Sequence, residues 1–249
     1  MNRLKGKRAL ITGGTTGIGL ATARLFLDEG ARVAITSRSQ ASLDVARNEL
    51  GSDVRMFVSD ASDAAAQKQL ADSVRQAFGA LDILFVNAGL VDMRPLEQID
   101  EAAFDRSLNI MLKGPYFLIQ ALLPVFANPA SIVLNGSINA HIGMPNTSIY
   151  AAGKAGLISL ARTLSGELLP RGIRVNVVSA GPIATPLLSN AGLSGDQLKA
   201  VATSIQAQVP AGRFGEATEI AQAVVFFASD ESAFTVGSEL IIDGGMSTL

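Results

Sequence analysis

The sequence predicts a doubly wound α/β fold, in which a seven-stranded parallel sheet carries helices on both faces. Short apolar, β-branched runs alternate with longer amphipathic stretches along the whole chain, which is the pattern of repeated βαβ units. Of the 249 residues, 48% are hydrophobic and only 17% are charged, so much of the chain must be buried. No linker, repeat or low-complexity tract separates two halves, and we expect a single domain over residues 1–249.

Each short apolar run is interpreted as a strand and each longer amphipathic stretch as a helix. The predicted strands lie at residues 7–12, 31–36, 53–58, 82–86, 130–135, 173–179 and 238–242. The predicted helices lie at residues 17–29, 40–50, 63–78, 101–127, 149–169 and 216–229.

One segment, residues 186–212, does not follow this alternation. Long insertions at the carboxyl edge of such sheets are often lids or pocket walls, and a surface helical hairpin without ligand contact is the alternative. Residues 186–195 carry no charged side chain, which favours an apolar pocket beneath a lid.

Composition excludes several classes of protein. With 20 basic and 22 acidic residues the net charge is −2, which leaves no basic field for nucleic acid. The chain has no cysteine and one histidine, His141, so we expect neither disulfides nor a metal site. Prolines interrupt the uncharged stretch 114–153 well short of the roughly 20 apolar residues of a membrane span. The first apolar run is too short for a signal peptide, and we expect a cytoplasmic protein.

A glycine-rich turn follows the first predicted strand, with the sequence Thr-Gly-Gly-Thr-Thr-Gly-Ile-Gly at residues 12–19. Glycine lets the backbone approach a pyrophosphate closely, and the amino terminus of the next helix offers unpaired N–H groups. The spacing departs from the general G-x-G-x-x-G pattern, because Thr22 stands at the third glycine position. A phosphate site is one interpretation, and a tight connection without a ligand is the other.

Further polar and glycine-containing segments follow other predicted strands. They include Asn87-Ala88-Gly89, Ser137 and residues 181–185. All of them fall just past the carboxyl ends of strands, the edge at which open α/β sheets bind ligands. Their clustering at this edge favours a binding site.

Tyr150 and Lys154 lie four residues apart at the start of a predicted helix and therefore share one face. A nearby ammonium favours the phenolate and lowers the pKa of a tyrosine. Lowering the pKa of Tyr150 by about three units takes roughly 4 kcal/mol of differential stabilisation. Lys154 and a cationic nicotinamide ring would have to act together to supply it. By itself, the pair also fits an ordinary exposed tyrosine and lysine.

As a set, these motifs resemble the short-chain dehydrogenase/reductase family over nearly the whole chain. The resemblance is carried by Gly13-x-x-x-Gly17-x-Gly19, Asn87-Ala88-Gly89, Asn109, Ser137, Tyr150-x-x-x-Lys154 and residues 176–181, 212–215 and 242–245. Ala180 departs from the pattern, since the family usually has a proline there. The resemblance implies a Rossmann fold and an enzyme that moves a hydride between a nicotinamide nucleotide and a carbonyl or secondary alcohol.

The resemblance also implies roles for individual residues. Tyr150 would be the general acid/base, Ser137 would hold the reacting oxygen, Lys154 would lower the pKa of Tyr150 and bind the nicotinamide ribose, and Asn109 would support a proton-relaying water. Asp60 would contact adenine, and His141 has no general role. The implied cofactor residues are Gly13, Thr15, Thr16, Gly17, Ile18, Gly19, Ser37, Arg38, Asp60, Ala61, Asn87, Ala88, Gly89, Tyr150, Lys154, Gly181, Pro182, Ile183 and Thr185.

The end of the second strand bears on the choice of nucleotide. At the position where an acidic side chain would bind the ribose 2′-hydroxyl of NAD, the chain has Ser37 followed by Arg38. Hydroxyls and a guanidinium can bind a 2′-phosphate, so NADP(H) is favoured and NAD(H) is possible. An ordinary surface cation is the alternative for Arg38, and Thr16 lacks the basic side chain of some NADP-preferring relatives.

Three functions are weighed. The first is an NADP(H)-dependent oxidoreductase acting on a small-molecule carbonyl or alcohol. The second is a 3-oxoacyl-[acyl-carrier-protein] reductase, but residues 120–132 offer no Lys or Arg to an acidic carrier. The third is an NADP-sensing module without chemistry, against which the presence of both Tyr150 and Lys154 counts. Relatives commonly pair the helices predicted at 101–127 and 149–169, so we expect a homotetramer.

Overall fold

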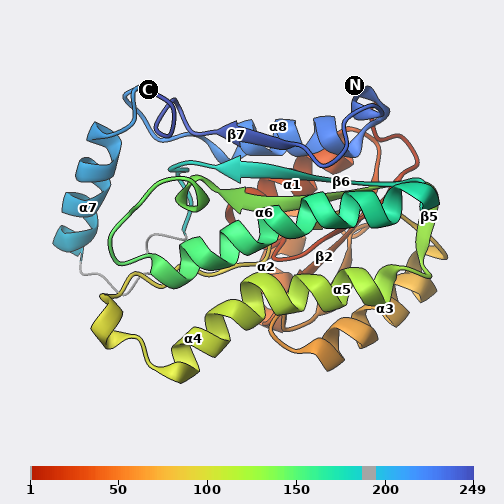
Figure 1. Cartoon of the computed structure of the whole chain (residues 1–249). Helices are drawn as coiled ribbons and strands as arrows, with labels where there is room; N and C mark the ends of the chain where they lie inside the picture. The colour runs from red at the N-terminus through yellow and green to blue at the C-terminus, as the bar shows by residue number, and fades with distance from the viewer. Residues whose placement is uncertain (1, 187–194) are drawn as a thin grey trace.

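The predicted fold is present in the computed structural model, which describes residues 2–186 and 195–249. One seven-stranded sheet has all its strands parallel, in the order β3-β2-β1-β4-β5-β6-β7 (Figure 1). The strands are β1 (Arg8–Ile11), β2 (Arg32–Ser37), β3 (Arg55–Val58), β4 (Leu81–Val86), β5 (Phe126–Ser137), β6 (Ile173–Ala180) and β7 (Glu239–Ile242). All seven strand predictions are confirmed.

The strand order reverses at β1. From β1 the chain adds β2 and then β3 on one side, and it returns to place β4 on the other side of β1. The loops that leave β1 and β4 therefore diverge, and they border a crevice at the carboxyl edge of the sheet.

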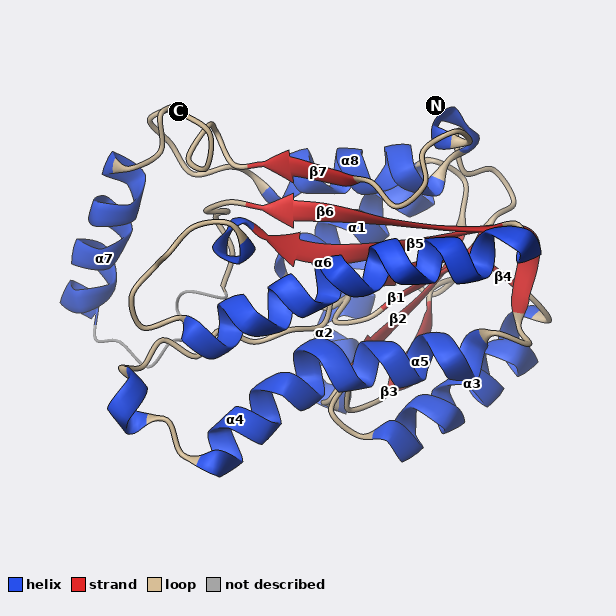
Figure 2. Cartoon of the chain, viewed as in Figure 1, coloured by secondary structure: helices blue, strands red, loops and turns tan. Residues whose placement is uncertain are grey.

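Helices cover both faces of the sheet (Figure 2). One face packs against α1 (Gly17–Asp28), α2 (Gln40–Leu50) and α8 (Ala217–Ala228), and the other against α3 (Ala64–Phe78), α5 (Gly114–Leu122) and α6 (Ser148–Leu168). In β4, Ile83 and Phe85 join the first core and Leu84 joins the second, and all three are fully buried. Because both faces are covered, the central strands are continuous apolar runs.

Local signals fix the ends of α2 and α3. At their amino ends, the side chain of Ser39 accepts a hydrogen bond from the N–H of Ser42, and that of Asp63 accepts one from Ala65. Both helices end at a glycine with positive φ, Gly51 at 84° and Gly79 at 75°. These caps explain why the predicted boundaries agree with the structure to within a residue.

The helix predicted over residues 101–127 is confirmed from Glu101 to Leu122, but it contains a π-helical turn and ends before residue 127. The structure has α4 (Glu101–Leu108), a π-helical turn at Asn109–Lys113 and then α5, and β5 already begins at Phe126. In the turn, the N–H of Gly114 donates to the carbonyl of Asn109, five residues back. The next residue, Pro115, has no N–H with which to continue the ordinary helical ladder.

Gly114 also allows a close approach between distant parts of the chain. A β-carbon at this position would lie 1.7 Å from the carbonyl oxygen of Ala61, in the loop that follows β3. Only glycine therefore lets the start of α5 pack against this loop. Ala61 lines the crevice described below, so this contact supports one of its walls.

The predicted lid at 186–212 is described only in part, because residues 187–194 lie outside the described residues. Its carboxyl-terminal part contains helix α7 (Gly195–Ala207), which the sequence analysis did not assign. Figure 1 places α7 at the carboxyl edge of the sheet, away from the helices that cover its faces. Within 2–186 and 195–249, none of the helices has the length and apolar character needed to cross a membrane.

We predict that Gly114→Ala lowers the free energy of unfolding by at least about 3 kcal/mol, because the methyl group would overlap the Ala61 carbonyl. The control is Gly166→Ala in α6, where a β-carbon meets nothing within 4 Å. This control should raise the free energy of unfolding by about 0.5–1 kcal/mol. Urea titration of both variants measures the two effects, and equal stabilities would contradict the close packing at Gly114.

Candidate active site

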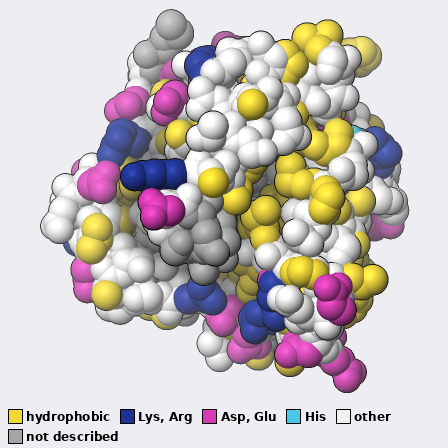
Figure 3. Space-filling view, turned by 90° about the vertical axis from the view of Figure 1, so that its left-hand side faces the viewer, with side chains coloured by type: hydrophobic (Ala, Val, Ile, Leu, Met, Phe, Trp, Pro, Cys, Tyr) yellow, Lys and Arg dark blue, Asp and Glu magenta, His cyan; other side chains and the backbone are white. Residues whose placement is uncertain are grey.

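Two adjoining cavities open at the carboxyl edge of the sheet, and Figure 3 shows hydrophobic side chains gathered around a hollow on this side of the molecule. The large cavity, of about 280 Å³, runs along the ends of β1, β2 and β4. The small cavity, of about 140 Å³, lies against the ends of β5 and β6. Four residues line both: Ile18, Asn135, Tyr150 and Thr185.

Most of the predicted cofactor residues come together in the large cavity. Those that line it are Gly13, Thr15, Thr16, Gly17, Ile18, Ser37, Arg38, Asp60, Ala61, Asn87, Ala88, Gly89, Tyr150, Lys154 and Thr185. Gly181, Pro182 and Ile183 line the small cavity instead, together with Ser137.

The glycine-rich turn leads into the amino end of α1, and the N–H groups of Gly13 and Gly14 donate to Oγ1 and to the carbonyl of Thr36. Gly13 and Gly17 have φ values of 63° and 53°, and Thr16, the N-cap of α1, makes no side-chain capping bond. The first turn of α1 has no acidic residue either, so its N–H groups suit an anion. Gly19 lines neither cavity. A β-carbon there would lie 2.1 Å from the Gly13 carbonyl oxygen, so Gly19 allows the turn to close onto the helix.

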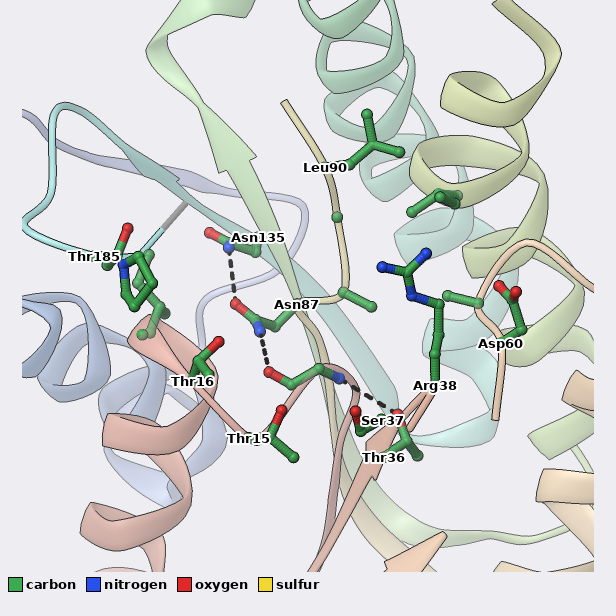
Figure 4. A pocket seen from close by; sticks show the side chains of 18 of the residues that line it. Thr15, Thr16, Thr36, Ser37, Arg38, Asp60, Asn87, Leu90, Asn135 and Thr185 are labelled. Atoms are coloured by element: carbon green, nitrogen blue, oxygen red, sulfur yellow. Dashed lines mark hydrogen bonds between the residues drawn. The ribbon is translucent and has the colours of Figure 1, made fainter. Parts of the chain in front are cut away.

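Asn87 joins this turn to the end of β4. The backbone N–H of Asn87 donates to the hydroxyl of Thr12 at 2.9 Å, and the N–H of Ala88 donates to the same hydroxyl at 3.0 Å. The side-chain Nδ2 of Asn87 donates to the carbonyls of Thr12 and Gly13 at 3.1 and 3.0 Å (Figure 4). The path of the turn is thereby tied to β4.

The same connection continues to β5 and α6. Asn135 donates from Nδ2 to Oδ1 of Asn87 at 3.0 Å, and Lys154 donates from Nζ to the carbonyl oxygen of Asn135 at 2.5 Å. We call the series Thr12, Asn87, Asn135 and Lys154 the polar chain. It links the ends of three adjacent strands to the helix that carries Tyr150. Asn135 was not among the predicted site residues, although it stands two positions before Ser137.

Tyr150 lies where the two cavities meet, and Lys154 is buried at the wall of the large cavity. Lys154 is only 5% exposed, and burial lowers the pKa of its ammonium group to about 8. Burial raises the pKa of Tyr150, and a hydrogen bond with Ser137 acts in the opposite direction. The Nζ of Lys154 lies 5.7 Å from the centre of the Tyr150 ring and is bonded to Asn135. Lys154 by itself therefore does not produce the predicted lowering of the Tyr150 pKa, because desolvation dominates.

Ser137 is oriented by a neighbouring turn. Its Oγ accepts a hydrogen bond from the N–H of Asn139 at 3.2 Å, which leaves the Ser137 proton available for donation. The Nδ2 of Asn139 donates to Oγ1 of Thr147 at 3.2 Å, just before the start of α6. Asn139 thus connects Ser137 with the helix of Tyr150. Sequence reasoning missed Asn139 and Thr147, since nothing in their spacing marks this contact.

At the end of β2, Arg38 extends along the large cavity, with Asp60 on the same side (Figure 4). Arg38 is exposed and has no hydrogen bond or ion pair with any residue that the structure describes. Asp60 accepts hydrogen bonds from the N–H and hydroxyl of Ser62, both at 2.8 Å. The backbone hydrogen bond is the main cause that lowers the Asp60 pKa, and the charge of Arg38 adds to it. A cation at this rim is thus available to a ligand.

Two residues singled out in the sequence, Asn109 and His141, lie outside both cavities, and a third, Ala180, lines the small one. Asn109 lines a depression between α5 and α6 instead of either cavity, and its carbonyl accepts from Gly114, so its predicted role in a water relay stays a prediction. His141 places Nε2 2.6 Å from the carboxylate of Glu239 and lines neither cavity. Ala180 is the last residue of β6 and lines the small cavity.

The large cavity fits a nicotinamide dinucleotide. Ser59 Oγ and Asn135 Oδ1 are buried without a hydrogen-bond partner among the described residues, and both residues line this cavity. Unpaired buried polar atoms are costly unless a ligand or water satisfies them. The N–H groups at the amino end of α1 suit the pyrophosphate, and Lys154, at the end of the polar chain, lines the same cavity. No group of potential metal ligands occurs in the described part of the chain.

Comparisons with known proteins agree with this geometry. A model of the family described as Enoyl-(Acyl carrier protein) reductase matches residues 13–247. The chain is 37% identical to the 3-oxoacyl-[acyl-carrier-protein] reductase of Thermotoga maritima, over 98% of this chain and 99% of that protein. It is 36% identical to the NADP-dependent (R)-specific alcohol dehydrogenase of Lentilactobacillus kefiri, over 98% of each. A solved short-chain dehydrogenase/reductase of Serratia marcescens superposes with a TM-score of 0.90 at 30% identity, covering 99% of this chain and 100% of that one.

The chain belongs to the short-chain dehydrogenase/reductase family. The predicted family and enzyme class are therefore confirmed, and this short-chain dehydrogenase/reductase is an NAD(P)-dependent oxidoreductase. The polar chain and the two cavities contain the residues from which we infer its oxidoreductase chemistry below.

We predict that the stability of this short-chain dehydrogenase/reductase depends on pH through Lys154. An unfolded lysine keeps a pKa near 10.5, whereas burial lowers that of Lys154 to about 8. Between these values the unfolded chain binds more protons, so the free energy of unfolding rises with pH across this window. Relative to Lys154→Met, the wild type should gain about 3 kcal/mol in stability from about pH 8 to 10.5.

Denaturant titrations of both proteins at several pH values within this window give the difference. Ionisation of the surface groups is common to both proteins and cancels in the comparison. Repeating the comparison in a Tyr150→Phe background removes the ionisation of Tyr150, whose ring centre lies 5.7 Å from Nζ of Lys154. Parallel pH dependences would show that the Lys154 ammonium is not desolvated in the folded protein.

Proposed function

We propose that the protein is an NADP(H)-dependent oxidoreductase that interconverts a carbonyl group and a secondary alcohol on a small molecule, with Tyr150 as general acid/base. The single observation that carries this proposal is the position of Tyr150, which lies between the two cavities and close to both Ser137 and Lys154. A substrate oxygen in the small cavity would meet the phenol beside a nucleotide in the large cavity.

Each residue of this group has a distinct task in the proposal. The Ser137 hydroxyl donates a hydrogen bond to the substrate oxygen and stabilises the charge that develops on it. Because burial raises the Tyr150 pKa, the phenol is protonated at neutral pH, as an acid that reduces a carbonyl must be. Lys154 then stabilises the phenolate left behind. When bound, the reduced nicotinamide supplies the hydride for the carbonyl carbon and is itself oxidised.

The preference for NADP(H) over NAD(H) is part of the proposal. Its support is Arg38, a cation on the rim without an ion-pair partner in the described residues, and the absence of an acidic residue between β2 and α2. A guanidinium can form charge-assisted hydrogen bonds to a 2′-phosphate, which a carboxylate would repel. The Lentilactobacillus kefiri relative is named as NADP-dependent.

A second candidate is reduction of a 3-oxoacyl group held on an acyl carrier protein. The description of the family model and the name of the Thermotoga maritima relative favour it. We prefer a free small molecule, because no basic side chain lines the small cavity among the described residues. Residues 120–132 have no Lys or Arg of their own, but Arg171 lies against them and donates to the carbonyl of Leu123. Comparing rates on carrier-bound and free ketones separates the two.

Other expectations complete the proposal. We propose that the chain works as one catalytic domain in the cytoplasm and as a homotetramer. The support for an assembly is a depression between α5 and α6 that Tyr116 lines. The aromatic side chains of Tyr116 and Phe104 are exposed on this side of the helices and would be covered by a partner. Light scattering that gives the mass of a monomer would contradict the tetramer.

We predict that Tyr150→Phe lowers kcat by about 10²- to 10⁴-fold, because the variant retains the ring but has no proton to donate. Calorimetric titration should give an unchanged Kd for NADPH. The matched control is Tyr116→Phe, which removes the hydroxyl of the other tyrosine, exposed on α5. An unchanged kcat for Tyr150→Phe would remove the proposed acid/base.

For Arg38→Gln we predict an increase of about 10- to 100-fold in KM for NADPH and little change in KM for NADH, because only NADPH carries the 2′-phosphate. Arg47→Gln is the control. Arg47, on α2, is exposed as Arg38 is, but it does not line the large cavity. Steady-state kinetics with both nucleotides decide. Equal effects on NADPH and NADH would reject Arg38 as the phosphate contact.

A further inference from the structure

Apolar side chains make up most of the lining of the small cavity, although Asn135, Asn139, Thr147 and Thr185 also line it. The apolar side chains come from several segments, among them Val91 and Met93 after β4, Met144 before α6, Ile205 in α7 and Phe214 in the loop before α8. Hydrophobic side chains surround the hollow on this side of the molecule (Figure 3). Burial of apolar ligand surface against such walls is favourable at about 25 cal/mol per Å².

The volume of the small cavity indicates the size of the group that it encloses. Its volume is about 140 Å³. An apolar protein cavity of about 150 Å³ accommodates one benzene molecule. The reacting end of a ligand that fills the small cavity is therefore about the size of a six-membered ring.

No charged side chain lines the small cavity among the described residues. The arginines next to its lining residues are already paired, Arg94 with Asp92 at 2.5 Å and Arg213 with Glu219 at 2.7 Å. The sequence of residues 187–194 also contains no ionisable side chain. A carboxylate or phosphate that entered this cavity would lose its hydration without gaining a cation, which is strongly unfavourable.

We propose that the substrate of this site is an uncharged, compact and mainly apolar ketone or secondary alcohol, with a reacting end about as large as a six-membered ring. This inference rests on the proposed function and makes it more specific. Ser137 and Tyr150 supply the polar contacts to the reacting oxygen, and the apolar walls bind the hydrocarbon part. A substrate with a carboxylate on the ring would then bind poorly because the carboxylate loses its hydration, and not because of its size alone.

The test compares two ketones that share one ring, cyclohexanone and 4-oxocyclohexanecarboxylate, with NADPH as the reductant. We expect kcat/KM for cyclohexanone to exceed that for the carboxylate by at least about 100-fold, the consequence of desolvating an unpaired anion. A larger uncharged control, 4-methylcyclohexanone, separates charge from size and should stay within about tenfold of cyclohexanone.

A second arm adds the missing cation. Met144→Lys places an ammonium at the wall of the small cavity, and we expect it to reduce the preference for cyclohexanone over the carboxylate by at least about tenfold. Met144→Gln has a similar length without a charge and should keep the wild-type preference. The wild-type comparison stands without either variant, so a misfolded variant leaves the test intact.

The outcomes separate the inference from the proposed function. A kcat/KM for 4-oxocyclohexanecarboxylate equal to or above that for cyclohexanone would overturn the inference and leave the oxidoreductase proposal standing. Failure to turn over any ketone or aldehyde of a broad panel with NADPH or NADH would overturn the proposed function, and the inference with it.

Discussion

The site depends on one constraint, the polar chain from Thr12 through Asn87 and Asn135 to Lys154. Every link is a hydrogen bond between groups at the ends of neighbouring strands, and the last link holds a buried ammonium against a carbonyl. Loss of one partner would leave a buried polar group unsatisfied, which costs about 1–3 kcal/mol and more for a charge. The positions of the glycine-rich turn, of β4 and of α6 are therefore fixed together.

Burying Lys154 and Tyr150 has an electrostatic cost, and the proposed reaction makes use of it. Burial lowers the Lys154 pKa and raises the Tyr150 pKa, so the folded protein disfavours the charged form of both groups. In such surroundings a charge that appears during reaction is stabilised more strongly by nearby donors than it would be in water. The hydrogen bond to the Asn135 carbonyl keeps Lys154 in place. A carbonyl is a dipole without net charge, so it does not neutralise the ammonium as a carboxylate would.

The sequence predicts the fold and the large cavity well because both follow local rules. Apolar runs define the strands, and residues such as Gly13 and Asn87 lie at strand ends, where parallel topology brings them to one edge. The contacts of Asn139 and the π-helical turn at Asn109 follow from tertiary packing, which no spacing reveals. The π-helical turn at Asn109 precedes Pro115, and Gly114 at its end packs against Ala61, from a loop that lies 53 residues earlier in the chain.

The two cavities differ in what builds them, and this difference fits the separate tasks that we propose for them. The large cavity is formed mostly by strand ends and by backbone groups of tight turns, which are held by the sheet itself. The small cavity also touches the ends of β5 and β6, but much of its apolar wall comes from side chains on loops and on α7, which can change without disturbing the sheet. Relatives that align along the whole chain at 36% and 37% identity can thus bear the names of different reductases and dehydrogenases. We therefore expect side chains such as Met93, Met144 and Phe214, and not the fold, to determine which substrate the protein accepts.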